Sequence, residues 1–60
     1  MTTDVATIKE IAAKIAAIRK EAEEIKEMSG GIQAVDRNVD RILSSVKMLE
    51  INVSDIADLL

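Results

Sequence analysis

The sequence contains no cysteine, no histidine and no aromatic residue. Without cysteine the chain forms no disulfide and offers no thiolate, and without histidine as well it lacks the usual ligands of structural zinc sites. Without phenylalanine, tyrosine or tryptophan it has no aromatic side chain to stack on nucleic-acid bases or to line a ligand pocket. The core must therefore be built from isoleucine, valine, leucine, alanine and methionine.

Long apolar runs and blocks of like charge are absent as well. The formal net charge is -3, with 8 lysines and arginines and 11 aspartates and glutamates mixed along the chain. Because a nucleic-acid-binding surface needs clustered basic residues, this balance argues against a nucleic-acid partner. No run approaches the roughly 18 apolar residues of a transmembrane helix, and residues 1–4 lack the basic and apolar regions of a signal peptide. We therefore expect no membrane partner and a cytoplasmic protein.

The large apolar residues of the second half of the chain are spaced alternately three and four apart. This spacing places them in one stripe along a helix that packs lengthwise against other helices, and we call this stripe a seam. The seam consists of Ile32, Val35, Val39, Ile42, Val46, Leu49, Val53, Ile56 and Leu60. No polar residue interrupts it, so a helix is predicted over about residues 32–59.

The first half of the chain carries a matching seam. Its members are Ile8, Ile11, Ile15, Ile18, Ala22 and Ile25. The charged residues fall mainly on the other side of the predicted helix, as in an amphipathic helix. Thr3 or Asp4 is a candidate N-cap, and Thr7 with Glu10 fits a capping box. We predict a helix over about residues 4–28 that begins near Asp4.

Ser29, Gly30 and Gly31 form the break between the two seams. Two adjacent glycines inside a helix would cost about 2 kcal/mol relative to alanine, whereas glycine just past a helix end adopts the left-handed conformation at little cost. The apolar spacing also changes phase here, because the first seam, extended in register, would reach Asp36 instead of Val35. A continuous helix with a shortened repeat is the alternative, but a turn over residues 29–31 explains both features.

A single helical hairpin of this length buries too little apolar surface to offset about 1.5 kcal/mol of conformational entropy per ordered residue. With no disulfide and no metal site, self-association is the remaining source of stability. The positions beside the second seam are mostly small or uncharged, which suits partial burial in a bundle better than a two-stranded coiled coil. We predict an all-α fold in which one antiparallel hairpin, residues 1–60, forms a homo-oligomer. A dimeric four-helix bundle is favoured over larger assemblies and over docking onto another helical protein.

The expected oligomer interface follows both seams. It comprises Ile8, Ile11, Ile15, Ile18, Ala22, Ile25, Val35, Val39, Ile42, Val46, Leu49, Val53, Ile56 and Leu60. Met48 and Ile51 lie one turn apart and off the seam, so the second helix is apolar on nearly all sides around Leu49. Burial in a broad bundle interface is the favoured explanation. The alternative is a docking patch for another protein, with Arg37 and Arg41 at its edge.

One stretch resembles a calcium-binding loop in spacing alone. Asp36, Asn38 and Asp40 match the first three side-chain ligands of such a loop. Arg41 then stands where the loop requires glycine, and Lys47 stands where it requires the closing glutamate. We therefore interpret this stretch as a solvated helix face.

Two further motifs lack the context that their chemistry needs. Asn52-Val53-Ser54 is a formal glycosylation sequon, but it lies inside a predicted helix and no export signal precedes it. The carboxylates of Glu23, Glu24 and Glu27 lack the histidines that accompany them in di-iron bundles. Without histidine, no residue stands out as the base that would activate a nucleophile. We expect no metal, no cofactor and no catalysis.

In length and predicted architecture the chain is similar to the small homodimeric four-helix RNA-binding regulators of plasmid copy number, with no shared residue motif. Leu49-Glu50-Ile51-Asn52 resembles a few residues of the helical signalling hairpin of bacterial chemoreceptors. The favoured function is a non-catalytic oligomerisation and protein-interaction module. The alternatives are a signalling or regulatory helix pair excised from a larger protein, an RNA-binding regulator, and an engineered bundle. The last is suggested by the first half, which has the alanine, isoleucine, glutamate and lysine content of idealised helices.

Overall fold

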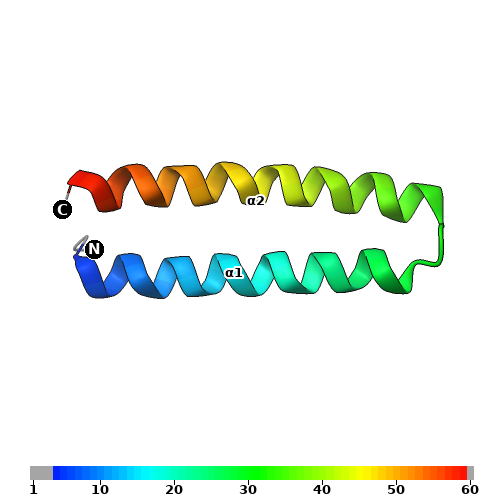
Figure 1. Cartoon of the computed structure of the whole chain (residues 1–60), viewed down its shortest axis with the longest axis horizontal. Coiled ribbons are helices and arrows are strands. Elements are labelled where there is room, and N and C mark those ends of the chain that lie inside the picture. Colours follow the sequence, from blue (N-terminus) through cyan, green and yellow to red (C-terminus); the bar gives the residue numbers. More distant parts are fainter. Residues whose placement is uncertain (1–3, 60) are drawn as a thin grey trace.

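The computed structural model describes residues 4–59, which form two antiparallel helices joined by a tight turn (Figure 1). Helix α1 spans Val5–Met28 and helix α2 spans Gln33–Leu59. The helices lie side by side along their length, with the turn at one end and the start of α1 and the end of α2 at the other (Figure 1). The predicted all-α hairpin is confirmed, and each helix begins one residue later than expected from the sequence.

Asp4 is the N-cap of α1. Its backbone is extended, its side chain accepts a hydrogen bond of 2.7 Å from the Thr7 N–H, and its carbonyl accepts one of 3.0 Å from the Ile8 N–H. The bond from Thr7 lowers the pKa of Asp4 below its ordinary value of 3.8, because it stabilises the ionised carboxylate. The alternative capping box starting at Thr7 is not used, since Thr7 already lies inside the helix. The other candidate cap, Thr3, lies outside the described residues.

Two glycines with left-handed backbone conformations make the turn. Gly30 has φ +61° and Gly31 has φ +92°, a region that residues with a Cβ rarely adopt. The Ser29 hydroxyl joins the two sides of the turn: it donates a hydrogen bond of 2.6 Å to the Asp36 carboxylate and accepts one of 3.2 Å from the Gly31 N–H. The chain therefore reverses direction at Gly30 and Gly31, and the alternative of one continuous helix is wrong.

The buried core of the hairpin is a single narrow row. Within residues 4–59, the buried side chains are Ile8, Ile15, Ala22, Val39 and Val46. They recur every seven residues in each helix, so each helix presents one heptad position to the other. Only one of the two positions of each predicted seam is thus buried by the hairpin itself.

The hairpin is a thin rod. Its Cα atoms extend over 42 × 17 × 15 Å, and their radius of gyration is 13.9 Å, compared with roughly 10 Å for a compact domain of this length. Such a shape leaves most of each helix in contact with solvent. Within residues 4–59, neither helix combines the length and the apolar character needed to cross a membrane.

Candidate functional site

Six large apolar residues of the predicted seams remain about half exposed. Each is between 39 and 45 % exposed, although isoleucine and leucine are normally buried. They are Ile11, Ile18 and Ile25 of α1 and Ile42, Leu49 and Ile56 of α2. Within each helix they recur every seven residues, so they lie in one row beside the buried row.

These two rows lie on the same side of the hairpin. An open groove of about 480 Å³ between the helices is lined by Ile18 and Ile25 of α1 and by Ile42 of α2. The other three residues are one or two heptads from these on the same helices, so all six belong to one surface. We call this six-residue surface the apolar face.

The two edges of the apolar face differ in charge. Lys14 and Glu21, which also line the groove, form the edge on α1. Each lies one helical turn before a member of the apolar face. The edge on α2 has the same spacing and carries Asn38, Ser45 and Asn52, which are exposed and uncharged.

The opposite side of the hairpin is held by ion pairs between the helices. Arg19 donates two hydrogen bonds to the Glu50 carboxylate, 2.9 Å from Nε and 2.7 Å from Nη2. Lys26 Nζ lies 2.7 Å from Oδ1 of Asp40. Arg19 and Glu50 each follow a buried residue by four positions, whereas Ile18 and Ile42 of the apolar face each precede one by four. The two sets therefore flank the buried row on opposite sides.

These contacts shift the pKa values of their groups. The hydrogen bonds from Arg19 hold the pKa of Glu50 below its ordinary value of 4.5 and raise the pKa of Arg19. The hydrogen bond to Asp40 likewise raises the pKa of Lys26 above its ordinary value of 10.5. Both effects favour the charged forms of Arg19, Lys26 and Glu50.

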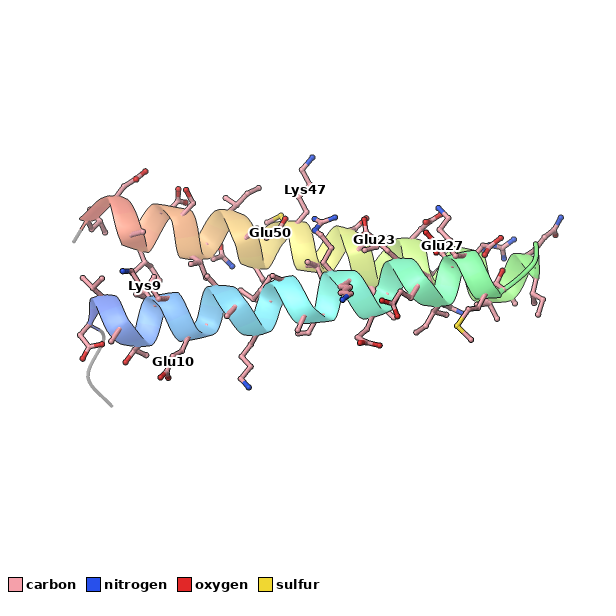
Figure 2. All side chains as sticks on the ribbon, turned by 60° about the horizontal axis from the view of Figure 1, so that its bottom comes forward. Lys9, Glu10, Glu23, Glu27, Lys47 and Glu50 are labelled. Atoms are coloured by element: carbon pink, nitrogen blue, oxygen red, sulfur yellow. The ribbon has the colours of Figure 1, made fainter. Side chains whose placement is uncertain are left out.

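The residues of the possible docking patch lie on the outer side of α2, away from α1. Met48 is 58 % exposed and Ile51 is 44 % exposed. Each is two residues from a position packed towards α1, about 200° around the helix, so neither belongs to the apolar face. Arg37 and Arg41 are exposed one or two heptads away on the same outer side. Figure 2 shows the neighbouring Lys47 pointing away from α1.

The three side chains with calcium-loop spacing lie in α2 and make other contacts. The Asp36 carboxylate accepts from Ser29, the Asp40 carboxylate accepts from Lys26, and the Asn38 side chain donates a hydrogen bond of 3.0 Å to the Ala34 carbonyl. Because they stand on a regular helix, their oxygens do not surround a common point. Among residues 4–59, no three carboxylates gather in an arrangement that holds a metal ion.

The remaining sequence motifs are on the surface of the helices. Glu23, Glu24 and Glu27 are exposed along α1, and Glu23 lies 4.0 Å from Arg19 (Figure 2). Asn52 is exposed within α2, on the uncharged edge of the apolar face.

The Arg19–Glu50 contact was not predicted from the sequence. Its signal was present, because both residues stand four positions after a buried member of their seams, Ile15 in α1 and Val46 in α2. Pairing them requires the register of one helix against the other, which the turn sets and the spacing within each helix does not. The division of the seams into a buried row and the apolar face depends on the same register.

In comparisons with known proteins, the chain matches no family model, no curated protein and no solved structure.

Proposed function

We propose that this hairpin is a non-catalytic self-association module, and that two copies join through their apolar faces into a four-helix bundle. The observation that carries the proposal is the row of three half-exposed residues on each helix, all on one side. A contiguous apolar surface of this kind is typical of an interaction site, because single exposed apolar residues are usually scattered.

The side of the hairpin that carries the apolar face is large enough to bind a second copy. A side of 42 by 17 Å has an area of roughly 700 Å², close to the roughly 800 Å² per partner of a standard stable interface. Two hairpins that bury these sides against each other would turn a two-helix rod into a bundle with a central core. The narrow buried row of the single hairpin supports this assembly, since it leaves folding dependent on further burial.

Molar mass measured by light scattering tests the proposal. The chain has a mass of 6.5 kDa, so two copies give about 13 kDa. We expect the double variant Ile18→Lys/Leu49→Lys to lose this association, because each lysine would place an unpaired charge at the centre of the interface.

Met48→Lys/Ile51→Lys is the matched control. It introduces the same two charges on the same hairpin but on the outer side of α2, and we expect it to retain the mass of the pair. A helical monomer for the unsubstituted chain would refute the proposal. Dissociation by the control pair alone would move the interface to the outer side of α2.

A further inference from the structure

A second copy can cover the apolar face in two arrangements, each with two-fold symmetry. In the first, both turns lie at the same end, and α1 of each copy packs against α2 of the other. In the second, the turns lie at opposite ends, and each helix packs against its own counterpart. All neighbouring helices are antiparallel in both arrangements.

The apolar residues fit both arrangements. Ile18 is the middle residue of the apolar face in α1, and Leu49 is the middle residue in α2. The contacts from Arg19 to Glu50 and from Lys26 to Asp40 show the register, in which Ile18 is level with the segment that contains Leu49. With turns at opposite ends, a two-fold axis across the rod at this level pairs the three apolar residues of each helix with the same three of the partner. With turns at the same end, the axis runs along the rod and pairs the three residues of α1 with the three of α2.

The charges at the edges distinguish the two arrangements. With turns at the same end, Lys14 and Glu21 would both meet the uncharged edge of the other copy. With turns at opposite ends, an axis at Ile18 brings Lys14 to within about one residue, 1.5 Å along the helix, of the level of Glu21 of the partner subunit. Because of the two-fold symmetry, this contact between Lys14 and Glu21 of the partner subunit occurs twice in the dimer. Within residues 4–59, neither Lys14 nor Glu21 has an ion-pair partner on its own chain.

From this complementarity we infer that the self-association proposed above, on which this inference rests, places the two turns at opposite ends of the bundle. Helix α1 then packs against α1 of the partner, with Lys14 of each copy beside Glu21 of the partner subunit. On the other edge Ser45 meets Asn52 of the partner subunit, a pairing of two hydrogen-bonding side chains without charge.

Spin-label distances test the arrangement directly. The chain has no cysteine, so Gln33→Cys places a single nitroxide beside the turn on an exposed position. Gln33 lies 16 residues before Leu49, so turns at opposite ends give an intermolecular distance of roughly 48 Å. Turns at the same end give less than about 30 Å, because packed helices lie about 10 Å apart and the two labels extend outward from opposite faces of the bundle.

The outcomes separate this inference from the proposed function. A long distance supports it, and a short one overturns the orientation while leaving self-association intact. Absence of any intermolecular distance in a sample that is monomeric by light scattering overturns both.

Charge reversal provides an independent test at low ionic strength. Lys14→Glu replaces two attractive contacts with two repulsive ones, and we expect the dimer dissociation constant to rise about 2- to 30-fold. Lys14→Glu/Glu21→Lys restores opposite charges across the interface and should recover most of the affinity.

Lys20→Glu is the control for net charge, because Lys20 lies about 200° around α1 from the buried Ala22. We expect it to change the dissociation constant much less than Lys14→Glu does. Equal weakening by both single variants, or failure of the double variant to recover, would overturn the assigned contact.

Discussion

At the scale of single residues, the contact from Arg19 to Glu50 links the middle of one helix to the middle of the other. Its two hydrogen bonds use the planar guanidinium in the geometry that best matches a carboxylate. Both side chains remain partly exposed, at 34 and 42 %, so water and salt weaken the contact. Its contribution to stability is therefore small, and it joins residues of α1 and α2 that the turn has already placed at the same level.

The pH dependence of stability reports on this contact. Because hydrogen bonds from Arg19 hold the pKa of Glu50 below 4.5 in the folded hairpin, the contact contributes stability above pH 4.5. The contribution is lost as the pH falls through the lower pKa of the folded form. We expect Glu50→Gln to lower the melting temperature slightly at pH 7 and to differ less from the unsubstituted chain near pH 3.

Thermal melts of both chains across this pH range make the measurement. Asp58→Asn, near the end of α2, removes one carboxylate from an exposed position and serves as the control for net charge. A difference between Glu50→Gln and the parent chain that stays constant from pH 7 to pH 3 would contradict the role assigned to the contact.

At the scale of the elements, the turn decides that the chain forms two helices. Gly30 has φ +61°, and an added Cβ would meet no atom within 4 Å, so any cost of substitution comes from the backbone. We expect Gly30→Ala to destabilise the hairpin by about 1–2 kcal/mol, the cost of the left-handed conformation for a residue with a Cβ. Gly30→Asn should cost less, because asparagine tolerates this conformation.

Urea unfolding at fixed protein concentration measures both effects. A Gly30→Ala variant as stable as the parent chain would show that the turn relaxes to another backbone conformation. If only Gly30→Asn is as stable as the parent chain, the turn has kept its left-handed conformation, because asparagine tolerates that conformation.

Both helices and the turn were predictable because their signals are local. The spacing of the apolar residues, the N-cap at Asp4 and the paired glycines each act over a few residues. What the spacing could not give was which member of each seam faces inside. Ile15 is 5 % exposed and Ile18 is 45 % exposed, yet both are isoleucines in the same seam. Which residue of a seam is buried depends on how the turn orients α2 against α1, and the sequence of one helix alone does not determine that orientation.

At the scale of the whole molecule, the proposed assembly couples folding to association. If two hairpins share one core, dilution favours the unfolded chains, so the melting temperature decreases as the protein concentration decreases. For about 120 residues unfolding together, a tenfold dilution is worth about 1.4 kcal/mol and corresponds to a shift of about 5 °C. Circular dichroism melts over two decades of concentration make the measurement.

The control for this measurement is the variant Ile18→Lys/Leu49→Lys, which should not associate and should therefore be largely unfolded at every concentration. A parent chain that melts at the same temperature throughout would show that the single hairpin is stable alone. The apolar face would then be a surface for another partner.

The positions of the helix ends determine how the hairpin could be joined to a larger protein. The start of α1 at Val5 and the end of α2 at Leu59 lie at the same end of the rod (Figure 1). Packed helices are generally about 8–10 Å apart. A host protein could therefore accept the hairpin as an insertion in a surface loop, because the chain leaves and re-enters at neighbouring points. The insert would project as an arm about 42 Å long, with Gly30 and Gly31 at its tip. Its apolar face, from Ile11 to Ile25 in α1 and from Ile42 to Ile56 in α2, would lie along the middle of the arm, clear of the host's surface.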